Sequence, residues 1–337
     1  MKQGLIDSYN RKIDYLRISV TDRCNLRCVY CMPEEGLENI PHPEILRYEE
    51  ILRIARIAVK NGVTKIRVTG GEPLIRKGII NFIEELSSIE GIQDLCLTTN
   101  GVLLKGMAGG LYNAGLKRIN ISLDSLKREK FYEITKRDLL PKIFQGLEEL
   151  QKYPIRPIKI NHVAIRGFND DEILDFAKFA REMPLQVRFI EFMPIDGDRF
   201  WNRDKCIPVE EIFQGIEKFK RLVPIKDTQN NGGPAKLYRF EDGIGEIGFI
   251  NPMSCIEFCS SCSRLRLTAD GHLRSCLFSN KEYDIKKLLR GGGGDENIKA
   301  LLDQAVSEKP EKHYLNDHYL NDHPVKRCNR GMSFIGG

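Results

Sequence analysis

The segment YLRISVTDRCNLRCVYC, residues 15–31, begins as a predicted strand over residues 15–20 and continues as a polar loop that carries three cysteines. Cys24, Cys28 and Cys31 follow the spacing C-x3-C-x2-C. Thiolates are soft ligands, so three of them in one short loop predict an iron–sulfur cluster with one iron left open. A structural zinc site or three core thiols are the alternatives, but no fourth Cys or His occurs before His42.

Strand-like and helix-like segments alternate outward from this loop, which favours parallel strands joined by crossover helices. The predicted strands are Tyr15–Val20, Lys65–Thr69, Asp94–Thr98, Arg118–Leu123, Ile158–Ile165 and Gln186–Ile190. The predicted helices are Tyr48–Asn61, Gly78–Ser88, Leu103–Ala114, Lys142–Gln151 and Asp171–Glu182. Six βα units predict an incomplete barrel with its chemistry at the carboxyl ends of the strands.

The alternation ends after about Phe192, where the stretch PIDGD (194–198) brings turn residues. We place a boundary near residues 193–205 and expect two domains, residues 1–195 and residues 196–337. The second domain is predicted to be smaller, with a helix near Val209–Phe219 and short strands at KLYRF (236–240) and GEIGFI (245–250).

Two low-complexity features follow in the C-terminal part. The run Gly291–Gly294 predicts a flexible linker, and the tandem YLNDH at 314–318 and 319–323 is too short to be a structural repeat. His313, His318 and His323 could bind a metal, but a solvated surface is the favoured interpretation.

A second set of cysteines lies in FCSSCSRLRLTADGHLRSC (258–276). Cys259, Cys262 and Cys276 have the spacing C-x2-C-x13-C, and the hairpin signal Asp270-Gly271 folds Cys276 back toward the other two. A zinc knuckle is the alternative. Cys255 competes as a ligand because it forms another C-x3-C-x2-C with Cys259 and Cys262, but the hairpin favours Cys276.

Composition limits the class of protein. The chain has 337 residues, 41% of them hydrophobic, and 52 Lys+Arg against 47 Asp+Glu give a net charge of +5, which excludes a nucleic-acid coat or a polybasic membrane tail. No signal peptide or long apolar run is present, so we expect a soluble cytoplasmic protein. Six of the ten cysteines cluster, which favours metal over disulfides; Cys96 is predicted to be core, and Cys206 and Cys328 receive no role.

Cationic side chains recur inside the predicted strands and after the second cysteine pair: Arg17, Lys65, Arg67, Lys159, Arg188, Arg264 and Arg266. Residues two apart on a strand share a face, so each closely spaced pair points the same way. Burying unpaired charge inside a barrel is costly, so these side chains predict an anion, and guanidinium groups favour a di- or triphosphate. The P-loop pattern G-x4-G-K-[ST] is absent from the sequence.

The turn TGGEP (69–73) follows the second predicted strand. Its glycines permit a close backbone approach that no side chain would allow, which could expose main-chain groups to a ligand; a plain βα turn is the alternative. Together with the cysteine loop and Tyr30, this turn resembles the signature of radical S-adenosylmethionine (SAM) enzymes. The resemblance implies that the open iron binds the amino and carboxylate groups of SAM.

Further segments extend the resemblance to one family within that superfamily. They are LTTNG (97–101), RFIEFM (188–193), SRLRLTADG (263–271) and the terminal Gly336-Gly337. From about residue 9 to its end, the chain closely resembles the GTP 3′,8-cyclase family of molybdenum cofactor biosynthesis. The resemblance implies an α/β fold, an incomplete (β/α)6 TIM-type barrel whose open side is covered by a C-terminal domain with a second 4Fe-4S cluster.

The resemblance also implies roles for individual residues. Cys24, Cys28 and Cys31 would hold the SAM-binding cluster, and Cys259, Cys262 and Cys276 the second cluster, whose open iron binds the guanine edge. Tyr30, Gly71, Ser122 and Met193 would line the SAM site. The GTP contacts would be Arg17, Lys65, Arg67, Thr98, Lys159, Arg188, Arg264, Leu265 and Arg266. The catalytic set would be Arg17, Arg264, Arg266 and the tail residues Gly336 and Gly337.

The implied reaction is reductive cleavage of SAM, hydrogen abstraction from the 3′ carbon of the GTP ribose and addition of that carbon to carbon 8 of guanine. The expected partners are a flavodoxin or ferredoxin as electron donor and a downstream cyclic pyranopterin monophosphate synthase, with neither nucleic acid nor membrane. A homodimer or a monomer is expected.

Two other functions remain open from the residues. A radical SAM maturase acting on a peptide would need further cysteines for another auxiliary cluster, and the arginine-rich barrel argues against it. A zinc- or iron–sulfur-dependent RNA-binding or regulatory protein would need a broad basic face, which a net charge of +5 does not support.

Overall fold

The computed structural model describes residues 4–36, 38–195, 200–225, 233–313, 328 and 330–336. Within these residues, twelve strands form one curved sheet in the order β12-β11-β10-β1-β2-β3-β4-β5-β6-β9-β8-β7. The strands are β1 Tyr15–Ser19, β2 Lys65–Thr69, β3 Asp94–Thr99, β4 Arg118–Ser122, β5 Ile158–Ala164, β6 Gln186–Glu191, β7 Leu222–Pro224, β8 Lys236–Phe240, β9 Glu246–Ile250, β10 Arg264–Leu267, β11 His272–Arg274 and β12 Tyr283–Asp284.

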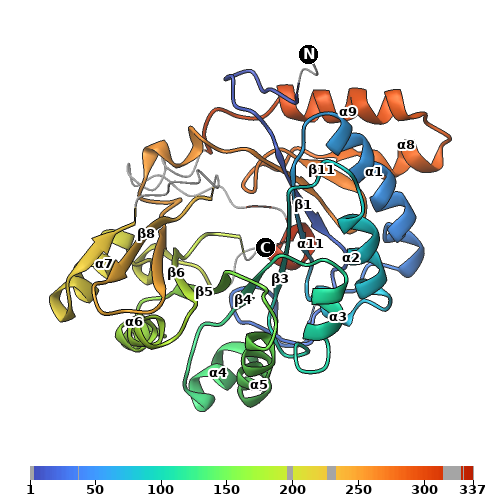
Figure 1. Cartoon of the computed structure of the whole chain (residues 1–337). Coiled ribbons are helices and arrows are strands. Elements are labelled where there is room, and N and C mark those ends of the chain that lie inside the picture. The colour runs from blue at the N-terminus through green and yellow to red at the C-terminus, as the bar shows by residue number, and fades with distance from the viewer. Residues whose placement is uncertain are drawn as a thin grey trace.

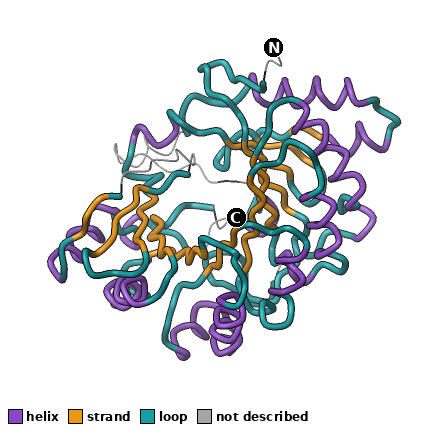
Figure 2. Tube along the Cα trace, viewed as in Figure 1, coloured by secondary structure: helices purple, strands orange, loops and turns teal. Residues whose placement is uncertain are grey.

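Strands β1 to β6 lie side by side in chain order and pair in parallel, which confirms the predicted incomplete (β/α)6 barrel. Helices surround the outside of the curved sheet, and the marked C-terminal end lies on its inner side (Figures 1 and 2). The α-helices are α1 Tyr48–Lys60, α2 Ile79–Ser87, α3 Ala108–Asn113, α4 Arg128–Thr135, α5 Leu140–Gln151, α6 Ile173–Glu182, α7 Val209–Phe219, α8 Ile285–Arg290, α9 Asp295–Ser307 and α11 Met332–Ile335. Short 3-10 helices are η1 His42–Glu44, η2 Pro73–Ile75, η3 Asp170–Glu172, η4 Arg203–Lys205 and η5 Ile256–Cys259.

The C-terminal segment extends the barrel sheet at both edges. Strand β10 pairs in parallel with β1, and β9 pairs in parallel with β6. The expected hairpin at Asp270-Gly271 is present, because β10 and β11 are antiparallel around it. Residues 1–195 and 196–337 therefore share one sheet, and the division between them stays a prediction.

Helix α3 is shorter than predicted. The expected helix Leu103–Ala114 begins only at Ala108, because Gly106 has a φ angle of 88°, which a right-handed helix does not allow. Helices α4, α8 and α9 were not predicted. The run Gly291–Gly294, expected to be a flexible linker, joins α8 to α9, which packs beside α1 (Figure 1).

The alternation of side chains along each strand separates core from cavity. On β1, Leu16 and Ile18 are fully buried and belong to the main hydrophobic core, whereas Tyr15 and Arg17 line the concave side. None of the described helices combines the length and the hydropathy needed to cross a membrane.

Candidate active site

The two cysteine sets lie at opposite ends of one pair of parallel strands. The register places Arg264 of β10 beside Tyr15 of β1. Cys262 therefore precedes β10 at the end where β1 begins, whereas Cys24 follows the other end of β1. Strand β1 has five residues, and at about 3.3 Å per residue roughly 16 Å of barrel interior separates the two ends.

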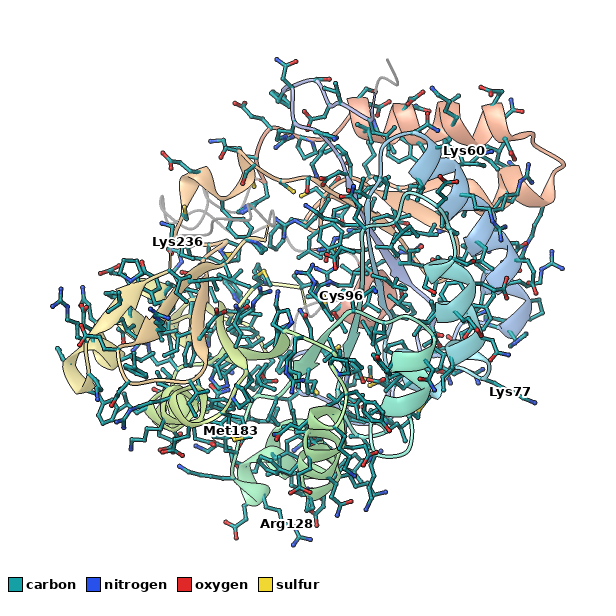
Figure 3. All side chains as sticks on the ribbon, viewed as in Figure 1. Lys60, Lys77, Cys96, Arg128, Met183 and Lys236 are labelled. Carbon is teal, nitrogen blue, oxygen red and sulfur yellow. The ribbon has the colours of Figure 1, made fainter. Side chains whose placement is uncertain are left out.

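One cavity of about 830 Å³ lies between these ends, and all six predicted ligand cysteines are in its wall. The wall also contains Tyr30, Gly71, Ser122, Met193, Arg17, Lys65, Arg67, Thr98, Lys159, Arg188, Arg264 and Arg266. Cys96, on β3, is 2% exposed and was predicted to be core; Figure 3 shows it near the centre of the molecule. The structure thus brings together residues from Arg17 to Cys276, which come from both predicted domains.

The first cysteine loop is organised around its sulfur atoms. The Cys24 Sγ accepts hydrogen bonds from the Leu26 amide at 3.4 Å and from the Asn100 side chain at 3.8 Å. The Cys31 amide donates to the Cys28 carbonyl at 2.8 Å, which closes a tight turn. Hydrogen bonds to ligand sulfurs are a common feature of iron–sulfur sites, so this loop fits a cluster.

The thiols of this loop are also close enough to influence one another. Burial and then the neighbouring Cys31 and Cys24 raise the pKa of Cys28 well above its ordinary value. Binding to a metal deprotonates a thiol outright, so a cluster would relieve this crowding of buried groups. Among the described residues, no three His, Cys, Asp or Glu side chains meet around a point that could hold a single metal ion. In a cubane each thiolate binds its own iron, so the three sulfurs need not meet at one point.

The glycines of TGGEP serve a purpose that the sequence did not indicate. The Gly71 amide donates to the Thr21 carbonyl at 2.6 Å, so it is already paired. A Cβ on Gly71 would lie 2.3 Å from the Arg23 carbonyl oxygen, and one on Gly70 would lie 2.7 Å from that of Thr21. The glycines are therefore needed so that the turn packs against the segment leading into the cysteine loop.

Glu72 of the same turn ties two further loops together. Its carboxylate accepts from the Thr99 hydroxyl and the Asn100 amide, both at 2.7 Å, and it is fully buried. Burial raises the pKa of Glu72 to about 7. Because Asn100 also contacts Cys24, Glu72 sets the position of the segment that supports the first cysteine loop.

Tyr30 is held by a carboxylate that the sequence analysis missed. Its hydroxyl donates to Asp124, which follows β4, and the other Asp124 oxygen accepts from the Val163 amide at 2.8 Å. Burial raises the pKa of Asp124 to about 6. Ser122 and Met193 lie in the same cavity wall, at the carboxyl ends of β4 and β6.

The predicted cationic residues form the inner face of the barrel. Arg17 lies beside Arg67 in the β1–β2 register and beside Arg266 in the β1–β10 register. Burial lowers the pKa values of Arg17 and Arg188 to about 10, and burial together with the charges of Arg17 and Arg264 lowers that of Arg266 well below its usual range. Clustered cations in a site shielded from water favour a multiply charged anion.

Carboxylates neutralise part of this charge at the amino ends of the strands. Asp94 of β3 forms a two-point ion pair with Arg118 of β4, whose Nε lies 2.8 Å from Oδ1. Lys65 lies 3.5 Å from Asp14. The Asp94–Arg118 pair was not predicted, although both residues begin strands that the sequence located correctly.

The second cysteine set is surrounded by cations and backbone carbonyls. Burial acts to raise the pKa of Cys262, but Arg264 and then Lys309 outweigh it and lower that pKa to about 6. Lys309 is buried and donates to the Arg264 carbonyl at 3.0 Å. Arg11 donates to the Cys259 carbonyl at 2.9 Å and to the Glu311 carbonyl at 2.6 Å. This environment favours a thiolate at Cys262, whereas burial raises the pKa of Cys259.

Cys276 and Cys255 differ in their relation to the cavity. Cys276 lines the cavity beside Cys259 and Cys262, and the charges of Cys276 and Cys262 both act to raise the pKa of Cys259. Cys255 precedes η5 and is outside the set of described residues that line the cavity. The geometry therefore supports Cys276 as the third ligand.

The C-terminal tail enters the barrel. The Gly336 carbonyl accepts from Arg266 Nη1 at 2.8 Å. Gly336 has a φ of 75°, and a Cβ there would lie 2.6 Å from Thr69 Cγ2. A residue with a side chain would fit neither this backbone angle nor this space. Gly337 lies outside the described residues, as do His318, His323 and the tandem YLNDH.

The prediction for His313 needs correction, and the prediction for Leu265 can concern its main chain only. Leu265 alternates with Arg264 and Arg266 on β10, so its side chain is fully buried in the core and only its main chain is left for a ligand. His313 is not part of a solvated surface: it is 3% exposed, lines the cavity and pairs through Nε2 with the Pro252 carbonyl at 2.8 Å. A lone histidine in a polar stretch gave no signal of this burial.

Comparison with known proteins identifies both halves of the chain. A family model described as the radical SAM superfamily matches residues 18–180, and one described as Molybdenum Cofactor Synthesis C matches residues 185–315. Three curated relatives are each named GTP 3′,8-cyclase. The protein of Thermodesulfovibrio yellowstonii is 52% identical over 307 residues, covering 90% of this chain and 94% of the relative. That of Syntrophomonas wolfei is 49% identical over 313 residues (93% and 95%), and that of Pelotomaculum thermopropionicum 48% over 332 residues (98% and 99%).

Solved structures share the fold. SuiB of Streptococcus suis bound to S-adenosylmethionine matches with a TM-score of 0.59 at 16% identity, covering 89% of this chain and 67% of that chain. The same protein bound to its precursor peptide SuiA matches with a TM-score of 0.55 at 16% identity, covering 92% of this chain and 67% of that chain. At this level of identity the likeness concerns the fold alone.

Proposed function

This chain belongs to the GTP 3′,8-cyclase family of radical SAM enzymes, and on that basis we propose how its own residues carry out the reaction. The enzyme uses two 4Fe-4S clusters and SAM to convert GTP to (8S)-3′,8-cyclo-7,8-dihydroguanosine 5′-triphosphate, which begins molybdenum cofactor biosynthesis. The proposal for its residues rests on one observation. Two three-cysteine sets lie at opposite ends of a single cavity whose inner wall is cationic.

The cysteines divide between the two clusters. Cys24, Cys28 and Cys31 hold the cluster that binds SAM, and Cys259, Cys262 and Cys276 hold the second. When bound, the reduced first cluster and SAM supply the one-electron chemistry that removes the hydrogen from the 3′ carbon of the ribose. The remaining groups bind and orient, and the reaction needs no acid–base pair from the chain.

The SAM side of the cavity is built from Tyr30, Gly71, Ser122 and Met193. The Tyr30–Asp124 hydrogen bond fixes the ring within the first cysteine loop, and the packing of Gly71 against Arg23 fixes the TGGEP turn against that loop. These contacts hold the wall of the site in place, and Asp124 itself lines the cavity. Preorganised walls of this kind reduce the cost of orienting the reactants.

The GTP side is the inner face of the barrel. Arg17, Lys65, Arg67, Lys159 and Arg188 form the triphosphate site, with Thr98 holding Arg67 through a 3.3 Å hydrogen bond. Arg264, Arg266 and the main chain of Leu265 border the nucleoside, and Gly336 closes the site from the tail. Gly337, which lies outside the described residues, is expected to share this role. With Cys24, Cys28 and Cys31 at one end of the cavity and Cys259, Cys262 and Cys276 at the other, GTP would bind between the two cysteine sets, with its guanine edge toward the second set.

Several aspects of the cellular setting belong to the same proposal. We expect electrons from a flavodoxin or ferredoxin and transfer of the labile product to a cyclic pyranopterin monophosphate synthase. A reducing cytoplasm suits six cysteines that must stay available to metal. We expect a homodimer or a monomer, and domains divided near residue 195.

An anaerobic assay tests the function directly. The reconstituted chain is incubated with GTP, SAM and dithionite, and the products are identified by mass spectrometry and NMR. The 3′,8-cyclised triphosphate together with 5′-deoxyadenosine supports the proposal. Cleavage of SAM with unaltered GTP, in a protein that holds both clusters, contradicts it.

Arg67→Met is expected to weaken GTP binding without loss of either cluster. A charge-assisted contact to phosphate contributes about 1.5–3 kcal/mol, which corresponds to about a tenfold to hundredfold change in affinity. Anaerobic equilibrium dialysis with labelled GTP measures the change, and Arg128→Met, which disrupts an exposed ion pair on α4, is the control. Equal GTP affinity in the Arg67 variant and the control would remove Arg67 from the triphosphate site.

GTP affinity is expected to fall as pH rises above about 6. Burial, followed by Arg188, Arg118 and Arg67, lowers the pKa of Lys159 to about 6. A bound triphosphate favours the charged amine and raises the pKa of Lys159. Between the pKa of Lys159 in the free protein and its pKa in the complex, GTP binding therefore takes up a proton and weakens as pH rises. Lys159→Arg keeps its charge throughout this range and should flatten the profile. If wild type and Lys159→Arg show the same pH dependence of GTP affinity, Lys159 does not carry the linkage.

A further inference from the structure

Charged side chains outside the cavity join the C-terminal tail to the β10–β11 hairpin. Arg330 Nη1 donates to both carboxylate oxygens of Asp270, at 2.9 and 2.8 Å, and Arg330 Nη2 lies 2.9 Å from Glu282 Oε2. We call Asp270, Glu282 and Arg330 the tail latch. From the sequence, Asp270 was only a turn residue.

The tail latch differs from the exposed ion pairs on the helices. The side chains of Asp270, Glu282 and Arg330 are 14%, 17% and 25% exposed, whereas the Arg128–Asp138 pair is 68% and 47% exposed. Fully exposed pairs contribute little because water screens them. A guanidinium that bridges two partly buried carboxylates fixes distance and direction at once.

A buried arginine extends the tail latch. Arg274 is 1% exposed, and its Nη1 lies 2.5 Å from Glu282 Oε1. Its Nη2 donates to Cys328 Sγ at 3.1 Å, so the chain is also held two residues before Arg330. Arg274 therefore holds Glu282 in place, and Arg330 is the residue of the tail latch that belongs to the tail.

The residues that follow Arg330 lie along the cavity. A Cβ on Gly331 would be 3.4 Å from the Cys31 carbonyl oxygen, so the tail passes beside the first cysteine loop. Ser333 lines the cavity, is 2% exposed, and its Oγ has no hydrogen-bond partner among the described residues. Gly336 then meets Arg266. A buried hydroxyl without a partner costs free energy, which a bound ligand would recover.

Apolar packing also holds this segment, but it does not define a direction. Ile335 is buried with Ile195, Met253 and Phe278. Burial of apolar surface is non-directional, so these contacts alone would allow α11 to shift or rotate. The ionic contact six residues before Gly336 supplies the missing constraint.

We propose that Arg330 is a positioning residue of the cyclisation: held between Asp270 and Glu282, it fixes residues 331–336 so that Ser333 and Gly336 face the ligands in the cavity. This inference rests on the proposed role of the tail in placing GTP. It predicts that an ion pair outside the cavity controls how much of the cleaved SAM leads to cyclised product.

The test compares Arg330→Met, Arg330→Lys and Asp270→Asn with wild type, all as holoenzyme with matched iron content. Arg128→Met is the control, because Arg128 forms a two-point ion pair on the outside of the barrel (Figure 3). Two quantities are measured: amide hydrogen exchange of residues 331–336, and the ratio of cyclised product to 5′-deoxyadenosine.

Arg330→Met and Asp270→Asn are expected to speed exchange in the tail and to lower the product ratio about tenfold or more, because small misplacements of a reacting group are costly. Arg330→Lys keeps the charge but cannot bridge both carboxylates. Its exchange rate and its product ratio should therefore lie between those of wild type and those of the other two variants. Arg128→Met should change neither quantity.

Unchanged exchange in both Arg330→Met and Asp270→Asn would show that the tail latch does not hold the tail and would overturn the inference. Faster exchange with an unchanged product ratio would overturn it as well, because the tail would then not position GTP. Absence of cyclised product in wild type would instead contradict the proposed function, while the exchange data would still report on the tail latch.

Discussion

Cys276→Ala is expected to lower bound iron from about eight to about four atoms per chain and to abolish cyclisation. Cys276 lines the cavity with Cys259 and Cys262, and β11 brings it back along the hairpin that carries Arg266. A cluster held by three thiolates does not persist with two, so the open iron proposed to bind guanine is lost. The first cluster lies at the other end of β1 and should still cleave SAM.

Cys255→Ala is the matched control for this variant. It removes a thiol four residues from Cys259, yet Cys255 is outside the set of described residues that line the cavity. Its iron and labile sulfide content and its cyclised product should equal those of wild type. Iron loss in Cys255→Ala with full iron in Cys276→Ala would reverse the ligand assignment. Uncoupled formation of 5′-deoxyadenosine by Cys276→Ala distinguishes loss of one cluster from general unfolding.

The barrel could be predicted because its signals are local. Each of β1 to β6 is a short apolar run bounded by turn residues, and the strand predictions agree with the structure to within about two residues. The cysteine spacings and the Asp270-Gly271 turn are equally local. Helix α3 was predicted to begin too early, at Leu103, because the sequence did not indicate that Gly106 has a positive φ.

The sheet edges could not be predicted from such signals. Strand β10 pairs with β1 across about 250 residues of chain. Strand β9 pairs in parallel with β6, although β7 and β8 lie between them in the sequence and β8 forms a hairpin with β9. Nothing in SRLRL specifies a parallel neighbour so far away. This pairing nevertheless places Cys262 and Cys24 at opposite ends of one cavity, so the central feature of the site depends on long-range contacts.

Supporting residues were missed for a related reason. Asp124, Lys309 and Arg330 act on Tyr30, Arg264 and Asp270 respectively, and each pair is separated by 45 or more residues. A single sequence shows the residue that carries a motif but not the distant group that orients it. The glycines of TGGEP illustrate the same limit, because their partner is the segment Thr21–Arg23.

Deletion of Gly336 and Gly337 is expected to leave folding, both clusters and uncoupled SAM cleavage largely intact while suppressing hydrogen abstraction from the 3′ carbon about a hundredfold. Gly336 occupies a gap that admits no Cβ and brings its carbonyl to Arg266, which lies beside Arg17. Without it, those arginines lose a fixed partner, and a misplacement of about 1 Å can cost about a hundredfold in rate. Deuterium transfer from 3′-deuterated GTP to 5′-deoxyadenosine measures the step at equal iron content. Gly336→Ala should reproduce most of the loss, because its methyl group would clash with Thr69. Equal deuterium transfer in the full-length and truncated chains would instead show that the tail has no role in placing GTP for hydrogen abstraction.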